Sequence, residues 1–274
     1  MEDDAAYFGH PGRDIRIGIK ALREAVPFIR KHRLWVGVLS YGWFSRFLLV
    51  VAFIAGLKFF SVLVQWAGGL KIDSPLAYGA SMLDLFSRMF KEGYHLFFLG
   101  GMKYGILVLA EVLLFHVVRR TMEILKGEKL DSSFKAFIQA QVRMVQVSLM
   151  AWVLEMLVTT LVSAGLGIMD ANWLKSPLSW VVQCYFLGYV VMDNYFEHYG
   201  VPVKQSAILV RRATGLALVV GLVAYVLLGL PVIGAILGPF IACIVSTLAL
   251  FEMDVKNWIL IPPTTHSTKK PTTH

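Results

Sequence analysis

The stretch that decides the fold runs from Ala213 to Phe251 and reads ATGLALVVGLVAYVLLGLPVIGAILGPFIACIVSTLALF, 39 residues without a charged side chain. A helix crosses the apolar core of a bilayer with about 20 residues, so this stretch is too long for one crossing. Proline removes a backbone donor and clashes with the preceding turn, which predicts breaks at Gly229–Pro231 and Gly238–Pro239. Two short spans and a pair of half-membrane helices both fit, and the prolines favour broken helices buried in protein.

The composition of the whole chain is that of an integral membrane protein. Of its 274 residues, 57% are hydrophobic and 16% are charged, whereas a soluble domain has roughly 45–50% apolar and about 25% charged residues. This excludes a disordered chain, a disulfide scaffold and a soluble enzyme for the bulk of the sequence. The two cysteines, Cys184 and Cys243, lie in apolar segments, so the sequence predicts neither a disulfide nor a metal site.

Four further segments are apolar and long enough to span a bilayer. They are residues 34–57, 94–118, 142–168 and 177–199. We therefore expect an all-α, polytopic membrane protein with a single transmembrane domain over residues 34–253, ending in the broken helical hairpin. The tail, residues 262–274, is rich in Thr, Pro and Lys and has nothing to bury, so we predict that it is disordered.

The basic residues predict how the chain is oriented. Of the 26 Lys and Arg residues, 19 lie on one face of the predicted layout and 5 on the other. The positive-inside rule places the larger group, which includes both termini and the loop at 119–143, in the cytoplasm. This count requires 213–251 to enter and return on the same side. The net charge of +8 is thus explained by topology and lipid contact, and we expect no nucleic-acid partner.

Two cytoplasmic elements have patterns of their own. Residues 13–33 carry apolar side chains at helical spacing, which predicts an amphipathic helix lying on anionic headgroups, kinked at Pro27. The apolar residues of this helix are Ile15, Ile19, Leu22, Val26 and Ile29. Around 119–143 we expect a projecting helical hairpin, with a helix stop at Gly127 and a new helix capped by Asp131 or Ser132.

Ionisable residues inside apolar segments are costly and mark partners or pathways. The deepest are Arg46, Glu111, Glu155 and Asp193. For these we expect internal ion pairs or a water-lined interior, the simplest pair being Arg46 with Glu155 or Glu111. Residues nearer the predicted span ends, namely Lys103, His116 and Glu197, are equally expected to extend to the membrane surface.

Two pairs of glycines at small-xxx-small spacing, Gly101–Gly105 and Gly234–Gly238, predict close helix packing. Catalytic signatures are missing: the chain has no GxSxG, no HExxH and no P-loop, and its seven histidines form no ligand-like pair. We therefore expect a protein that is not an enzyme and uses no cofactor or metal. The basic run Arg30, Lys31, His32 and Arg33 anchors the first span or collects an oxyanion such as sulfate.

Three groups of motifs follow one another in an order that matches a known family. They are Gly18–Leu22 with Phe28–Trp35; Leu114–Phe115 with Glu123–Gly127; and Tyr189–Lys204 with Arg211–Arg212, Leu230–Gly234 and Gly238–Pro239. Together they resemble the CysZ-type sulfate permeases and the related etoposide-induced membrane proteins over most of residues 14–253. The resemblance implies an oligomeric, all-helical protein of the bacterial inner membrane, with half-penetrating hairpins and sulfate uptake. The family's Gly-x-Arg-Arg element is replaced here by Ile29–Arg33, and its Pro-Phe by Leu114–Phe115.

The leading hypothesis is a CysZ-like homo-oligomer that forms a pathway for a small anion, sulfate first, without nucleotide hydrolysis. Arg30, Lys31 and Arg33 would attract the anion, and the buried charges would line or brace the interior. The alternative is a non-transporting subunit that scaffolds or anchors a larger membrane complex. A third hypothesis is a lipid-handling protein with lipid between its broken helices.

Overall fold

The computed structural model describes residues 10–36, 47, 50–51, 102–128, 133–228, 230 and 234–253. Every regular element in these ranges is a helix, which confirms the all-α fold class for the described part of the chain. The helices are α1 (Pro11–His32), α4 (Met102–Leu109), α5 (Glu111–Lys126), α6 (Phe134–Ile168), η4 (Asn172–Leu174), α7 (Lys175–Glu197), α8 (Val203–Arg212), α9 (Thr214–Leu228) and α10 (Gly234–Glu252). Most of the predicted span 34–57, the loop at 58–93 and the tail at 262–274 lie outside the described residues.

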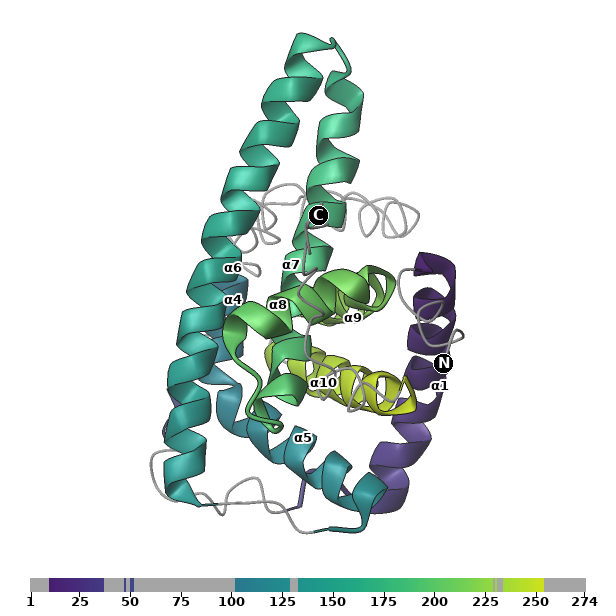
Figure 1. Ribbon diagram of the computed structural model, residues 1–274, viewed down its shortest axis with the longest axis vertical. Coiled ribbons are helices and arrows are strands. Elements are labelled where there is room, and N and C mark those ends of the chain that lie inside the picture. Colours follow the sequence, from purple (N-terminus) through teal and green to yellow (C-terminus); the bar gives the residue numbers. More distant parts are fainter. Residues whose placement is uncertain are drawn as a thin grey trace, which may run out of the picture.

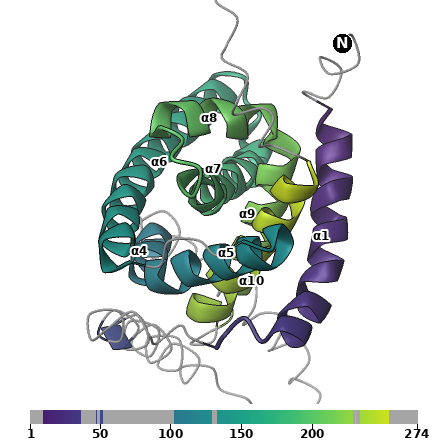
Figure 2. The ribbon, with the colours of Figure 1, turned by 60° about the horizontal axis from the view of Figure 1, so that its bottom comes forward.

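Helix α7 is the centre of the bundle. Figure 2 shows it surrounded by α6, α4, α5, α10, α9 and α8, with α1 outside α9 and α10. From Phe186 to Phe196 every side chain of α7 is buried. This half of α7 is mostly apolar, as expected for a helix enclosed by others, and its polar residues Asp193 and Asn194 are buried as well.

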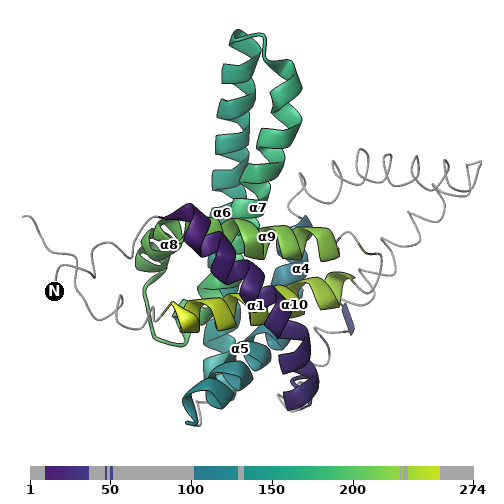
Figure 3. The ribbon, with the colours of Figure 1, turned by 90° about the vertical axis from the view of Figure 1, so that its right-hand side faces the viewer.

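The long apolar stretch folds into two helices, as predicted. Helix α9 ends at Leu228 and α10 begins at Gly234, so the break falls at the first of the two expected positions. Pro231 itself lies outside the described residues. The second expected break is wrong: α10 continues through Pro239 as one helix from Gly234 to Glu252. The two helices lie side by side (Figure 3).

Helices α6 and α7 form a hairpin that projects beyond the rest of the molecule (Figures 1 and 3). Two described helices, α6 and α10, are long and apolar enough to cross a membrane. The pair α8 and α9 would add a third span only if the two helices counted as one, and they meet at 98°. The segment predicted as a span at 142–168 is confirmed as a helix long and apolar enough to cross a membrane, and the helix begins earlier, at Phe134. The segment predicted as a span at 177–199 is also a helix, α7, but it is not among the described helices that are apolar enough to cross.

The segment 94–118 is not one continuous span in its described part. It divides at Ala110 into α4 and α5, and α5 packs across the bundle against α10. The hairpin that projects furthest is formed by α6 and α7. The cytoplasmic hairpin expected around 119–143 stays a prediction, and its two helices are the end of α5 and the start of α6.

The ends of this connection are nevertheless close to the prediction. Gly127 ends α5 in the left-handed conformation, with φ of 72°, and its N–H donates to the carbonyl of Glu123. Helix α6 is capped by Ser133, whose side chain accepts from the N–H of Ala136. The expected caps, Asp131 and Ser132, are thus wrong by one or two positions, because the helix starts later in a polar run in which several residues suit a cap.

Helix α1 contacts α9 and α10 through its smallest residues. Gly18, Ala21 and Ala25 are buried in this contact, and small side chains let helix axes approach closely. The predicted apolar stripe is divided: Ile15, Ile19 and Val26 are exposed, whereas Leu22 and Ile29 are partly buried and pack against the core. Figure 3 shows α1 bent near its C-terminal end, the part of the helix that contains Pro27.

Candidate functional site

Two ion pairs lie within the bundle, and the first, which is almost completely buried, joins α4 to α6. Lys103 Nζ is 2.6 Å from Glu155 Oε1, and both residues are almost completely buried. Tyr104 donates its hydroxyl to the other carboxylate oxygen, and Lys103 also donates to Gln183 of α7 at 3.4 Å. Lys103 therefore does not extend to the membrane surface, because its ammonium group finds acceptors inside the bundle.

This first pair differs from the expected one. Arg46, the predicted partner of Glu155, lies outside the described residues, and Lys103 takes that place. Both oxygens of Glu155 and two of the three donors of Lys103 have partners. A pair with its hydrogen bonds made in this way fixes the relative positions of α4, α6 and α7, and this arrangement is a structural brace.

The second pair joins α6 to the end of α7. Arg143 donates from Nε and Nη2 to the two oxygens of Asp193, at 2.7 and 2.8 Å. Its Nη1 donates to the carbonyl of Val201, and the Ser206 hydroxyl of α8 donates to Asp193. This geometry is the two-pronged arrangement that makes guanidinium–carboxylate pairs strong and directional.

The sequence placed Asp193 among the deep charges but left Arg143 among the loop bases. The sequence did contain one indication that Arg143 belongs to the interior: it lies at the start of an apolar segment, where a long side chain can turn back into the protein. Its partner lies 50 positions along the chain, a separation that one sequence does not reveal.

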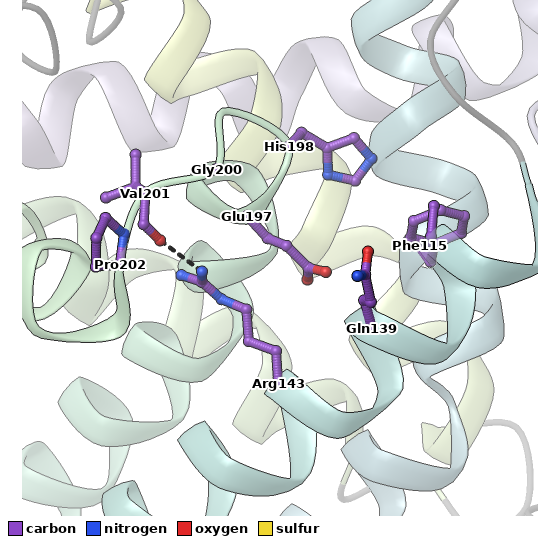
Figure 4. A pocket seen from close by; sticks show the side chains of 9 residues that line it. Phe115, Gln139, Arg143, Glu197, His198, Gly200, Val201 and Pro202 are labelled. Atoms are coloured by element: carbon purple, nitrogen blue, oxygen red, sulfur yellow. Dashed lines mark hydrogen bonds between the residues drawn. The ribbon is translucent and has the colours of Figure 1, made fainter.

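A pocket of about 370 Å³ lies beside this second pair. We call it the hairpin-base pocket, and its lining includes Phe115, Gln139, Arg143, Glu197, His198 and Val201. Figure 4 shows the Glu197 carboxylate and the Gln139 amide directed toward one another. The His198 and Phe115 rings lie on the other sides of the same space.

The protonation of His198 follows from its hydrogen bond. Its Nδ1 lies 2.9 Å from the carbonyl oxygen of Asn194. A carbonyl only accepts, so Nδ1 carries the hydrogen and Nε2 of the neutral ring offers a lone pair. That Nε2 is buried and has no hydrogen-bond partner among the described residues.

Glu111, at the start of α5, is completely buried. Neither of its carboxyl oxygens has a hydrogen-bond partner in the described part of the chain. Asp193, Glu197 and Arg143 are close enough to act on it electrostatically. The structure thus brings Glu111 and Asp193 into one polar region, as expected of deep charges, and keeps Glu155 in the separate brace.

The basic run lies away from these groups. Arg30, Lys31 and Arg33 are exposed at the C-terminal end of α1. The following Leu34 is buried, and the carbonyl of Val36 lies 3.0 Å from Nε2 of His116 on α5. His116 is therefore buried and does not extend to the membrane surface. Figure 1 places this end of α1 at the opposite end of the long axis from the α6–α7 tip.

Comparisons of the chain with family models, with curated proteins and with solved structures gave no match.

Proposed function

We propose that this chain is a membrane-inserted protein that conducts a small anion, with sulfate as the first candidate, along a path between copies of itself. Insertion through the α6–α7 hairpin is supported by the apolar side chains that it exposes. Leu161 is 63% exposed, Ile168 is 89% and Trp173 is 76%. Apolar residues exposed together on this scale fit lipid better than water.

The observation that carries the anion hypothesis is the separation of charge along the molecule. Arg30, Lys31 and Arg33 are exposed at one end, and Lys175 is the one basic residue between 165 and 181 at the other. An exposed cluster of one sign raises the local concentration of ions of the opposite sign. The cluster also agrees with a cytoplasmic position for the N-terminal end.

The described interior supports a path between copies rather than through one chain. Lys103 is buried and Arg143 is partly buried, and each is already matched by a carboxylate. Glu111 and Glu197 add acidic groups to the same bundle. An anion inside a single described bundle would face this surplus of acid, whereas the outer surface near α1 is basic.

The test is uptake of radiolabelled sulfate by proteoliposomes that contain the purified chain. We expect uptake above that of empty vesicles, and a loss of about tenfold in Arg30→Ala/Arg33→Ala at low salt. The matched control is Arg16→Ala/Arg23→Ala, which removes two exposed arginines nearer the other end of α1 and is expected to retain uptake. No uptake above empty vesicles, or equal loss in both variants, overturns the proposal.

The scaffold alternative is favoured by one observation, the length of apolar hairpin that no other described helix covers. Of the 18-residue apolar stretch of α6 that could cross a membrane, only 22% is buried. Purification in mild detergent separates the two functions. A foreign subunit at fixed stoichiometry would support the scaffold, and a symmetric homo-oligomer would support the anion pathway.

A further inference from the structure

We propose that Glu111 and Glu197 form a proton-binding pair, which exchanges its proton with water through the hairpin-base pocket. Glu111 is the first residue of α5 and Glu197 is the last residue of α7. Both helices lie outside the group of described helices that are apolar enough to cross a membrane. The inference does not depend on the anion pathway, because it concerns the interior of the bundle and not the exposed bases of α1.

Glu111 is the buried member of the pair. It is completely buried, and neither of its carboxyl oxygens has a hydrogen-bond partner among the described residues. A buried carboxylate without a partner is costly, and the cost falls when the group is neutral. Glu111 therefore holds a proton at neutral pH. A proton passes between carboxyl groups and water molecules, so the site needs no opening for a larger ligand.

The base that acts on Glu111 is already paired. Arg143 attracts the Glu111 carboxyl electrostatically, but it donates to both oxygens of Asp193 and to a backbone carbonyl. Glu197 and Asp193 oppose a negative charge on Glu111. Cys243 of α10 also acts on this place and supplies no positive charge. Three carboxyl groups thus share one guanidinium group, and this favours protonation over a further ion pair.

Glu197 is the member of the pair that meets water. It is partly buried and lines the hairpin-base pocket, where Figure 4 shows its carboxylate among the lining side chains. Phe115, another lining residue, lies one helical turn from Glu111 on the same face of α5. Burial raises the pKa of Glu197 to about 7, against the opposing effect of Arg143. Glu197 therefore gains and loses a proton near neutral pH at the edge of the pocket.

His198, the histidine of the pocket wall, does not serve as the proton carrier. Its Nδ1–H is bonded to the carbonyl of Asn194, and its Nε2 is buried. Burial, together with Arg119 and Lys126, lowers the pKa of His198 to about 4, against the effect of the bond to Asn194. The ring is therefore neutral over the range in which Glu197 titrates.

The pair links protonation to the packing of three helices. Arg143 ties α6 to Asp193 of α7, and Asp193 also accepts the hydroxyl of Ser206 of α8. A proton on Glu197 removes a competing negative charge and leaves Arg143 to Asp193. A buried acid that is connected to water by a second acid has the arrangement of a proton relay.

The experiment is infrared spectroscopy of the purified full-length chain in a maltoside detergent, which has no carbonyl group of its own. The technique detects the carbonyl band of a protonated carboxyl group. At about pH 8 ordinary Asp and Glu side chains are ionised, so we expect a band that comes mainly from Glu111. Glu111→Gln should lose this band and keep the fold, because one neutral group replaces another. Asp14→Asn changes a buried acid of α1; it is the matched control and should keep the band.

A second measurement tests the role of Glu197. When the pH is lowered to about 6.5, we expect the band to grow by about half or more as Glu197 takes up its proton. Glu197→Gln should keep the band at about pH 8 and lose this growth. Thermal melting of each variant confirms folding. Absence of the band in the unmodified chain at about pH 8, an unchanged band in folded Glu111→Gln, or unchanged growth in folded Glu197→Gln overturns the proposal. The spectra involve no sulfate, so failure of the anion pathway and failure of the proton pair are separate results.

Discussion

Gly188 on α7 and Gly221 on α9 face one another where the two helices cross. A Cβ atom added to Gly188 would lie 1.9 Å from the carbonyl oxygen of Ala217, and one added to Gly221 would lie 1.7 Å from that of Cys184. Both distances are far below any van der Waals contact. The backbones of the central helix and of α9 therefore touch directly, and only glycine fits at this crossing.

The crossing predicts that Gly188→Ala and Gly221→Ala each destabilise the fold by about 3 kcal/mol or more, because the helices must move apart and lose packing along their length. Gly165→Ala is the control, since a Cβ there meets nothing within 4 Å and alanine favours a helix by about 1 kcal/mol. Thermal unfolding in detergent measures all three. Midpoints for the crossing variants equal to that of Gly165→Ala would contradict the close approach.

Glycine spacing alone would not have identified this crossing. The predicted pair at Gly234–Gly238 does pack closely, since Cβ atoms there would meet backbone atoms of Leu227 and Leu228. Gly105 of the other pair has open space around it, and Gly101 lies outside the described residues. The decisive glycines, 188 and 221, are on different helices, so their pairing depends on the tertiary fold and leaves no local pattern.

Features that depend on neighbouring residues, such as where a helix breaks or ends, could be predicted from the sequence. The helical class, the break before Gly234 and the stop at Gly127 follow from apolar length, proline and the left-handed conformation of glycine. The ion pairs were not, since Glu155 and Asp193 each bond a residue at least 50 positions away. Burial of these acids was inferred correctly, and their partners required the packing of three helices.

The Lys103–Glu155 brace predicts a strongly non-additive pair of substitutions. Lys103→Met or Glu155→Gln alone leaves a buried group without its partner and should cost about 3 kcal/mol or more. The double variant removes both charges and keeps an amide oxygen for Tyr104, so it should cost less than the sum of the two. A double-mutant cycle on unfolding midpoints measures the coupling, and strictly additive losses would show that the pair does not act as one unit.

Asp14 ties α1 to the start of α9. It is buried, and it accepts a hydrogen bond from the backbone N–H of Gly215. A Cβ on Gly215 would lie 2.9 Å from Cβ of Asp14, so glycine is needed for this approach. Burial raises the pKa of Asp14 above its ordinary value of 3.8, against the opposing effects of Gly215 and of Arg13 and His10.

This shift gives stability a dependence on pH. A pKa that is higher in the folded chain means that Asp14 contributes stability that is complete below pH 3.8 and is lost as pH rises through the folded value. Asp14→Asn keeps an oxygen for Gly215 and does not titrate. We expect the variant to match the unmodified chain at the acidic end and to be more stable at neutral pH, as measured by unfolding midpoints. Parallel curves over the whole range would contradict this assignment.

Insertion of the α6–α7 hairpin predicts which positions water can reach. Leu161 on α6 and Arg23 on α1 are both exposed on the surface of the protein. In vesicles, we expect Leu161→Cys to be protected from a water-soluble maleimide because lipid covers it, while Arg23→Cys reacts. The native Cys184 and Cys243 are buried and give little background. Addition of SDS should expose both introduced thiols, so equal labelling before SDS would place the hairpin in water and remove the basis for a membrane-spanning role.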